Sequence, residues 1–298
     1  MAGTSLPRKA ILVVNAHSRR GRDAFEEAVE KLTAAGIDLI DSHAVKNPEI
    51  MEPVVKAAIT KAPMVILGGG DGTLSSNVDH FMGTRKVFAI LPMGTANSFA
   101  RTLGIPLDID GAVAVIANGR RRRIDLGRID GDYFANAAAM GLSPLIADSV
   151  PRYLKRYFGI IGYLIWAVRC AFRFRPFRLT VDDGKARATV WATEVRIANG
   201  RHLGGVELVE DAALDSGEII VQAVTGRHLG RLAWNWFAAL FKLSSREATV
   251  TEFHGRKLKL DTRPSQNISI DGEVAAKTPV TVTVARQAVT VAAPNPPD

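Results

Sequence analysis

The sequence is poor in cysteine, in acidic residues relative to basic ones, and in long apolar runs. Cys170 is its single cysteine, so no disulfide can form within the chain. The first 15 residues lack the basic, apolar and small-residue pattern of a secretory signal, so we expect a reducing, cytoplasmic environment. The most apolar uncharged run, residues 158–168, has 11 residues where a membrane span needs about 20, so we expect no span.

Two common nucleotide-binding fingerprints are also missing. The sequence contains no G-x-x-x-x-G-K-[ST], and no G-x-G-x-x-G follows its first predicted strand. This disfavours P-loop NTPases and Rossmann dehydrogenases. The six histidines and Cys170 show no metal-ligand spacing, so we expect no zinc site and interpret Cys170 as a packing residue.

Length and charge limit the number of domains and the kinds of partner. With 298 residues, of which 47% are hydrophobic, the chain can build two domains with their own cores. A net charge of +8 favours anionic partners such as nucleotides, an acidic membrane face or nucleic acid. Because no helix-turn-helix, zinc or aromatic-basic RNA motif accompanies the charge, we do not expect nucleic-acid binding.

The distribution of apolar residues changes near residue 124. Before it, short apolar runs at residues 10–15, 65–67 and 87–91 alternate with helical patterns, which predicts an α/β unit with a mostly parallel sheet. After it, strand-like blocks alternate with turns, which predicts an antiparallel β-rich domain interrupted by helical segments at residues 152–174 and 229–243. The final runs, residues 280–284 and 288–291, are predicted to form two strands. The second would complete the sheet of one domain or of the other.

Glycine-rich segments follow the second and third predicted strands. Gly68 to Gly70 and Gly72 allow close approach to a polyphosphate, and Gly94 opens a helix whose N–H groups favour anions. An ordinary turn is the alternative for a lone glycine-rich loop, but two loops at the carboxyl edge of one sheet predict a ligand crevice. The predicted nucleotide cradle consists of Asn15, Ser18, Gly69, Gly70, Asp71, Gly72, Thr73, Leu74, Gly94, Thr95 and Asn97.

These motifs resemble the diacylglycerol kinase catalytic-domain family, in particular its soluble bacterial lipid kinases. The Gly-Gly-Asp-Gly-Thr string at residues 69–73 also occurs in NAD kinases and 6-phosphofructokinases. The string Pro-x-Gly-Thr-x-Asn-x-x-Ala-Arg at residues 92–101 narrows the resemblance to the lipid-kinase branch.

The resemblance implies an NAD kinase/diacylglycerol kinase-like fold of two domains with the active site in the cleft. An α/β nucleotide-binding domain would comprise residues 1–128 with the tail 287–298, and a β-rich, sandwich-like domain would comprise residues 129–286. The implied activity is an ATP- and Mg²⁺-dependent phosphorylation of a hydroxyl on diacylglycerol or a related long-chain lipid alcohol.

Site roles follow from the same resemblance. Glu273 matches the general base, and Asp271 would share its face on a strand; a hairpin turn with solvated carboxylates is the alternative for 271–272. Asp71 and Asp125 match the carboxylates that hold catalytic Mg²⁺. Asp215 and Glu218 lie near a second, structural Mg²⁺ site, which is in doubt because Ser216 stands where an aspartate is usual.

Two apolar segments flanked by arginines, at residues 152–178 and 232–242, predict contact with a membrane surface; helices packed on the β-domain are the alternative. The run Arg120–Arg123 is predicted to be a solvated loop, with an anion contact as its alternative. We therefore expect a cytoplasmic, peripherally membrane-associated enzyme and leave a homodimer open. The competing functions are an NAD kinase-like or other soluble-metabolite kinase, and a non-catalytic nucleotide- or lipid-binding regulator.

Overall fold

The computed structural model describes residues 5–16, 19–151, 162, 165–241, 243–270 and 273–296. Side chains are described for these residues except 19, 20, 148, 244 and 273. Ser18, Asp271 and, within the predicted helical segment 152–174, residues 152–161, 163 and 164 therefore lie outside the described residues.

The first part of the chain alternates strands with helices, as predicted. Its elements are β1 (Lys9–Asn15), α1 (Arg19–Ala34), β2 (Asp38–Val45), α2 (Met51–Lys61), β3 (Met64–Gly69), α3 (Asp71–Val78), β4 (Val87–Pro92), α4 (Ser98–Leu103) and α5 (Ile109–Asn118). Strands β2, β1, β3 and β4 are neighbours in that order, and all three pairings are parallel.

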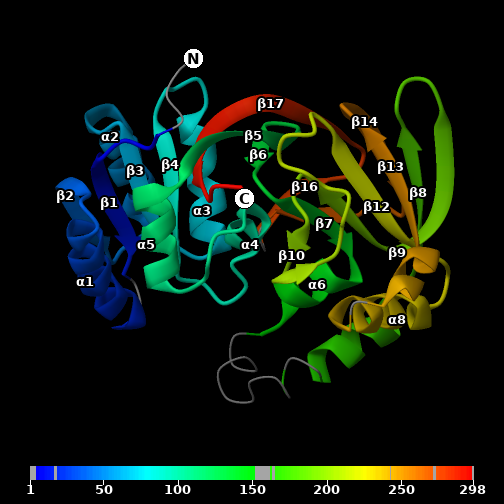
Figure 1. Cartoon of the computed structure of the whole chain (residues 1–298). Coiled ribbons are helices and arrows are strands. Elements are labelled where there is room, and N and C mark those ends of the chain that lie inside the picture. Colours follow the sequence, from blue (N-terminus) through cyan, green and yellow to red (C-terminus); the bar gives the residue numbers. More distant parts are fainter. Residues whose placement is uncertain are drawn as a thin grey trace.

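Helices cover both faces of this parallel sheet. Helices α1 and α5 pack together on one face, and α2 and α3 lie on the other (Figure 1). Every residue of β3 and β4 is buried, which explains why these strands are continuous apolar runs without alternation.

The second part is β-rich. Its elements are β5 (Arg120–Ile129), β6 (Asp132–Phe134), β7 (Ala137–Gly141), α6 (Leu142–Ser149), a helix at 165–173, β8 (Phe177–Asp182), β9 (Arg187–Ala198), β10 (His202–Leu203), β11 (Val206–Glu207), β12 (Ile219–Thr225), α8 (Leu229–Leu240), β13 (Val250–Gly255), β14 (Lys257–Arg263), β15 (Asn267–Ile270), β16 (Glu273–Lys277) and β17 (Val280–Ala293). The pairings among β7, β8, β9, β12, β13, β14, β15 and β16 are antiparallel, as predicted.

Strand β17 joins the two parts into one continuous sheet. Its first residues pair with β14, and Thr290 and Val291 pair in parallel with β4 (Figure 1). The prediction of two separate strands at 280–284 and 288–291 was wrong, because a single strand bends at an irregularity between Ala285 and Val289. Gln287, with φ +47°, lies in this bend.

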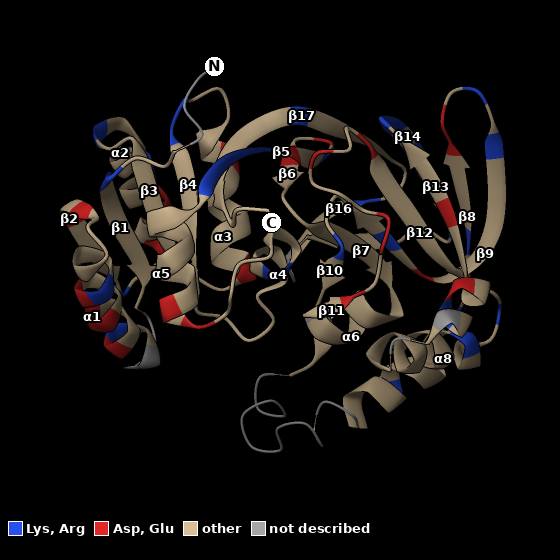
Figure 2. Cartoon of the chain, viewed as in Figure 1, with Lys and Arg blue, Asp and Glu red and all other residues tan. Residues whose placement is uncertain are grey.

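The prediction that the arginine run forms a solvated loop was also wrong. Residues 120–123 lie in β5 and pair with the end of β17 (Figure 2). Arg120 donates to Pro294 O at 3.3 Å, and Arg121 donates to Ser5 O at 2.9 Å. The run therefore holds both ends of the described chain against the sheet.

Candidate active site

Three parallel strands end at the same edge of the sheet. In the register, Val14 lies opposite Gly68 and Gly69 lies opposite Pro92, so the segments that follow β1, β3 and β4 begin side by side. The Asn15 side-chain amide donates to Thr73 Oγ1 at 3.0 Å. This contact connects the end of β1 to the first turn of α3.

The two glycine-rich loops touch backbone to backbone. A Cβ added at Gly94 would lie 2.6 Å from Gly70 Cα, a separation that real Cβ atoms do not show. A Cβ at Gly69 would lie 2.7 Å from Thr73 Cβ. Glycine is therefore required here by close approach, whereas the added Cβ of Gly72 meets open space.

Side-chain hydrogen bonds fix the shape of both loops. Asn97 has a left-handed backbone with φ 48°, and its amide accepts from Gly94 N at 2.8 Å and donates to Gly94 O at 2.9 Å. Asp71 Oδ1 accepts the Phe99 N–H at 3.0 Å, which ties the start of α3 to α4. The loops thus form one preorganised unit.

A cavity of about 530 Å³ opens beside these loops. Five of the predicted cradle residues line it: Asn15, Gly69, Gly70, Gly94 and Asn97. Glu27 of α1 and Asp108, which caps α5 through Gly111 N at 2.7 Å, also line it and were missed, because neither lies in a glycine-rich motif. The side chain of Leu74 is completely buried in the core, and Thr95 is exposed.

A second cavity, of about 450 Å³, lies between α3 and the β15–β16 hairpin. It is lined by Gly72 and Ser75 from α3, by Tyr133 from β6, and by Ile270 and Val274 from the hairpin. Glu273 pairs with Ile270 across this hairpin and precedes Val274, so its backbone lies at the cavity. The glycine loop and the segment carrying residue 273 therefore share one cavity.

A third cavity, of about 660 Å³, continues from the other side of the hairpin. Its lining includes Val274 and Lys277 of β16, Leu145 of α6, and Phe174 and Arg175. Val274 lines both this cavity and the one beside Gly72. The hairpin thus lies between a cavity of mixed lining near the glycine loop and a more apolar one beside α6.

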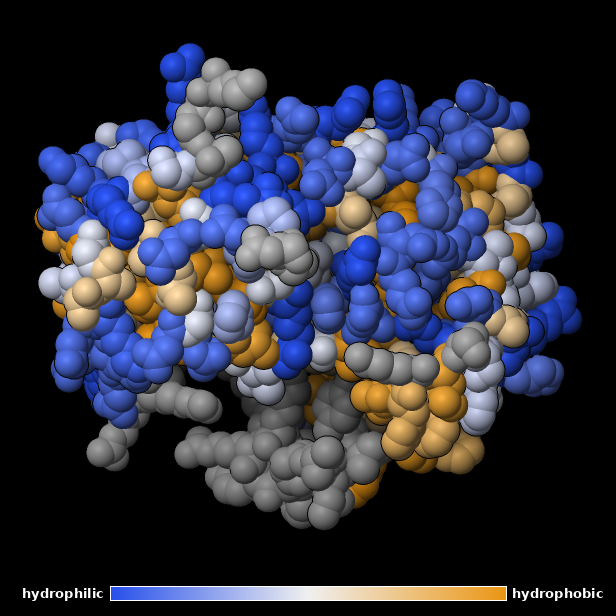
Figure 3. All heavy atoms as spheres, viewed as in Figure 1, coloured by the Kyte–Doolittle hydropathy of each residue, from blue (hydrophilic) through white to orange (hydrophobic). Residues whose placement is uncertain are grey.

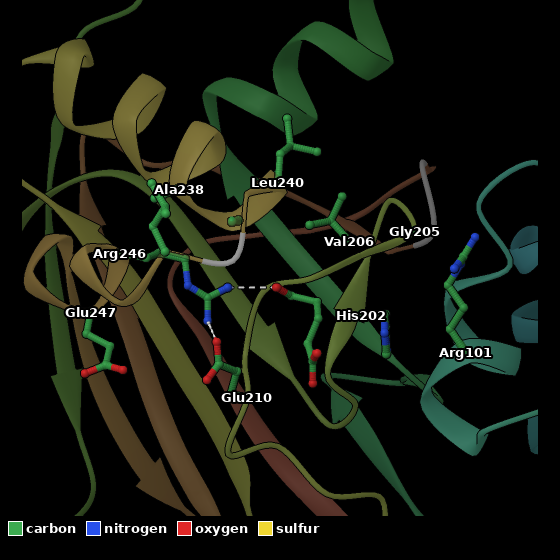
Figure 4. A pocket seen from close by; sticks show the side chains of 12 residues that line it. Arg101, His202, Gly205, Val206, Glu210, Ala238, Leu240, Arg246 and Glu247 are labelled. Carbon is green, nitrogen blue, oxygen red and sulfur yellow. Dashed lines mark hydrogen bonds and ion pairs between the residues drawn. The ribbon is translucent and has the colours of Figure 1, made fainter.

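A fourth cavity, of about 610 Å³, lies between α4 and α8 (Figure 4). The Arg246 guanidinium is nearly buried there and pairs with Glu210 at 2.5 Å and with Glu207 O at 2.7 Å. This cation therefore serves to hold the segment that follows β11. Arg101 of α4 and Leu240 of α8 lie on opposite sides of the cavity.

Polar contacts join α4 to the β-rich part. Thr102 Oγ1 donates to Asn136 Oδ1 at 2.9 Å and lies 3.1 Å from His202 Nδ1. Gly205 N donates to Ser98 Oγ at 2.9 Å. Burial lowers the pKa of His202 below its usual value. Helix α4, which follows the glycine loop after β4, is therefore held to the β-rich part through both Ser98 and Thr102.

Comparison with known proteins identifies the family. The diacylglycerol kinase catalytic domain matches residues 9–129, and the YegS C-terminal NAD kinase beta sandwich-like domain matches residues 136–293. The chain belongs to this lipid-kinase family. The suspected resemblance and the expected two-domain fold class are thereby confirmed.

Individual proteins resemble this chain over most of its length. A diacylglycerol kinase of Bacillus subtilis is 26% identical over 91% of this chain and 92% of its own length. A YegS-like lipid kinase of Klebsiella pneumoniae is 31% identical over 69% of this chain and 70% of its own length. A solved diacylglycerol kinase of Bacillus anthracis superposes with a TM-score of 0.75 at 22% identity, covering 97% of both chains. Yeast NADH kinase complexed with NADH superposes with a TM-score of 0.53 at 12% identity, covering 96% of this chain and 84% of its own, so it shares the fold.

The Asp125 side chain of this lipid kinase is buried, and both of its carboxylate oxygens accept hydrogen bonds. Its two carboxylate oxygens accept the backbone N–H groups of Gly217 and Gln287, each at 2.6 Å. Asn199 also donates to its backbone carbonyl at 2.8 Å. Asp125 thus fastens β5 to the loop before β12 and to the bend of β17.

The residues around the doubtful second metal site have other partners. Asp215 pairs with Arg122 at 3.0 Å, and Glu218 is exposed with its backbone N–H on Ser216 Oγ at 3.2 Å. Across the part of the chain that the structure describes, no three His, Cys, Asp or Glu residues cluster as metal ligands. A cation at Asp215 would compete with the guanidinium already there.

Proposed function

We propose that this lipid kinase transfers the γ-phosphoryl group of ATP to the hydroxyl of diacylglycerol or a related long-chain lipid alcohol. One observation carries the proposal: Gly72, in the glycine loop, and Val274, next to Glu273, line the same cavity. A phosphoryl donor held by the loop and an acceptor held at the hairpin would meet there. Phosphoryl transfer depends mainly on such positioning and on charge neutralisation.

The loops would hold the nucleotide through their backbone N–H groups. Gly69, Gly70 and Gly94 present backbone without side chains at the 530 Å³ cavity. The acceptor oxygen would form a bond to the γ-phosphorus while the bond to the bridging oxygen of ADP breaks, and Glu273 would take the hydroxyl proton. Asp271 is proposed to support Glu273 from the same hairpin.

The residues near the loop suit a hard cation. Mg²⁺ typically uses one or two carboxylates together with substrate phosphates, and the half-buried Asp71 stands at the start of α3 beside the cradle. Asp71 is therefore the first residue proposed to hold Mg²⁺, which would neutralise charge on the phosphates. Asp125 is proposed as its partner, although its oxygens already accept two backbone N–H groups. Asp215 and Glu218 are proposed for the second, structural Mg²⁺ site, where Asp215 already pairs with Arg122.

The remaining cradle residues, Ser18, Thr73 and Thr95, are proposed to complete the phosphate contacts. We propose a division into residues 1–128 with 287–298 and residues 129–286, with the enzyme acting in the cytoplasm at a membrane surface.

Replacement of Glu273 tests the function. Glu273→Gln keeps the size of the side chain but removes its ability to accept a proton, so phosphorylation of dispersed diacylglycerol is expected to fall by roughly 10²- to 10⁴-fold. ATP affinity, measured by calorimetry, is expected to stay within about twofold of wild type. The matched control is Glu49→Gln, an exposed carboxylate in the other half of the chain.

Full activity of Glu273→Gln would remove the assigned base. A substrate panel addresses the alternatives: preferential phosphorylation of NAD would favour a soluble-metabolite kinase, and ATP binding without turnover of any acceptor would favour a regulator. Product mass would identify the lipid.

A further inference from the structure

The outer face of α8 is apolar and exposed. Phe237 is 46% exposed, and Leu240 and Phe241 are each 63% exposed. The rings of Trp234, Phe237 and Phe241 form a ladder, with centroids 5.5 Å and 4.6 Å apart. Figure 3 shows the corresponding apolar area at the lower right of the molecule, where α8 lies. Because aromatic side chains in contact bury each other only in part, this face offers a large apolar area to a partner.

Apart from the buried Asn235, the inner face of α8 is also apolar. Leu232, Ala238 and Ala239 are buried against the β-rich part. An apolar helix face is normally covered by other apolar groups. In the part of the chain that the structure describes, the outer face of α8 is uncovered, so this face suits an external partner.

Two neighbouring helices extend this face. Helix α6, the helix at 165–173 and α8 pack on one another through a common apolar cluster that includes Leu142, Trp166 and Leu232. On their outer sides, Leu145, Ile165, Val168 and Phe172 are exposed, Phe172 at 88%. We call the outer sides of these three helices the apolar helix surface.

A buried polar network fixes α8 in place. Arg196, which is completely buried, pairs with Glu194 at 2.7 Å and donates to Asn235 of α8 at 2.8 Å. Trp236 of α8 donates to Ser143 of α6 at 3.2 Å. Because these bonds tie α8 to β9 and to α6, the ladder on its outer side faces outward in a fixed orientation.

The charges on two of the three helices, the helix at 165–173 and α8, are of one sign, whereas α6 contains Asp148. Neither residues 165–181 nor residues 219–246 include an aspartate or glutamate. Arg169, Arg173 and Arg175 are exposed at the helix 165–173, with Arg169 over the Trp166 ring at 5.7 Å. A second copy related by a two-fold axis would bring these arginines towards their equivalents. An anionic bilayer instead matches both the apolar ladder and the positive charge.

The surface also borders the cavity proposed for the acceptor. Leu145, Arg173 and Arg175 line the 660 Å³ cavity together with Val274. A lipid entering between these helices would reach the hairpin that carries Glu273.

We propose that the apolar helix surface docks the enzyme on an anionic bilayer, with Trp234, Phe237 and Phe241 inserted among the acyl chains and Arg173 and Arg175 on the head groups. The docking proposal extends the proposed function, on which it depends only for the identity of the lipid acceptor. No helix of the described residues is long and apolar enough to cross a bilayer, so the contact is one of docking.

Vesicle sedimentation tests the docking. Wild-type protein is expected to bind vesicles of 70% phosphatidylcholine and 30% phosphatidylglycerol more tightly than vesicles of phosphatidylcholine alone. Phe237→Ser is expected to weaken binding on the order of tenfold, because it removes an inserted aromatic ring. Arg173→Glu is expected to weaken binding at least on the order of fivefold, and only to the anionic vesicles.

Matched controls lie on the other half of the chain. Ile40→Ser removes an apolar residue of the same exposure, 46%, and Arg85→Glu reverses an exposed charge. Both are expected to leave binding unchanged. Circular dichroism checks that each variant folds. If Phe237→Ser and Arg173→Glu bind vesicles as well as wild type, or if Phe237→Ser converts a dimer of the wild type into a monomer in light scattering, the proposal is overturned.

Activity in two formats separates this proposal from the function. Phe237→Ser is expected to lower phosphorylation of diacylglycerol embedded in the anionic vesicles while leaving phosphorylation of a short-chain, water-dispersed diacylglycerol unchanged. Equal loss in both formats would overturn the docking role. If the wild type phosphorylates neither substrate but still binds the vesicles in a Phe237-dependent manner, the proposed function fails and the docking surface stands.

Discussion

At the scale of residues, the clearest functional constraint is the contact between two glycines. Gly70 and Gly94 approach so closely that a Cβ on either would press on the backbone of the other, at 3.2 Å and 2.6 Å. Their spacing in the sequence does not reveal this, since they belong to different loops. The contact arises only because β3 and β4 are parallel neighbours.

Gly94→Ala is therefore expected to push the two loops apart and to weaken ATP affinity by about tenfold or more, measured by calorimetry, because a shift of the loop moves the donor groups from the phosphates. Gly131→Ala is the matched control, since its added methyl group meets open space in the turn before β6, outside the cradle. An equal loss in both variants would contradict the assigned role of the close approach.

At the scale of elements, α8 depends on the buried Arg196–Glu194 pair. Burial lowers the pKa of Arg196, and the neighbouring carboxylate of Glu194 opposes that shift. Gln222 and Asn235 accept its remaining donors, each at 2.8 Å. Glu194 thus balances the charge of Arg196, and acceptors on two strands and on the helix receive its hydrogen bonds.

Arg196→Met is expected to lower the free energy of unfolding by roughly 3–5 kcal/mol, because it leaves the Glu194 carboxylate buried without its partner. The double variant Arg196→Met with Glu194→Met removes both charges and is expected to recover part of this loss. Urea denaturation followed by circular dichroism measures both. A single variant as stable as wild type would contradict the assigned role of the pair.

At the scale of the whole molecule, Asp125 lies where the two parts of the chain meet. It bonds the loop at Gly217 and the bend at Gln287, while β17 continues from the antiparallel strands to the parallel sheet. The same residue is the proposed partner of Asp71 in holding Mg²⁺. Stability and activity measurements separate these two roles.

Asp125→Asn replaces one accepting oxygen by an NH₂ group that faces a backbone N–H, so we expect a loss of about 1–3 kcal/mol in the free energy of unfolding. Urea denaturation measures this loss, and Asp130→Asn, in the turn that follows β5, is the control. If stability is unchanged while phosphoryl transfer is lost, Asp125 acts in the chemistry alone and the fastening role is wrong.

The sequence by itself determined the alternation of strands and helices before residue 124, the antiparallel strands after it, and the glycine loops, because these depend on local periodicity and on the steric freedom of glycine. It did not determine that 280–284 and 288–291 form one bent strand, or that the arginine run lies in a strand, since pairing partners distant in sequence decide both. Only the tertiary structure placed Gly72 and Val274 on one cavity, because that neighbourhood forms when the fold brings a hairpin some 200 residues later to the cavity beside α3.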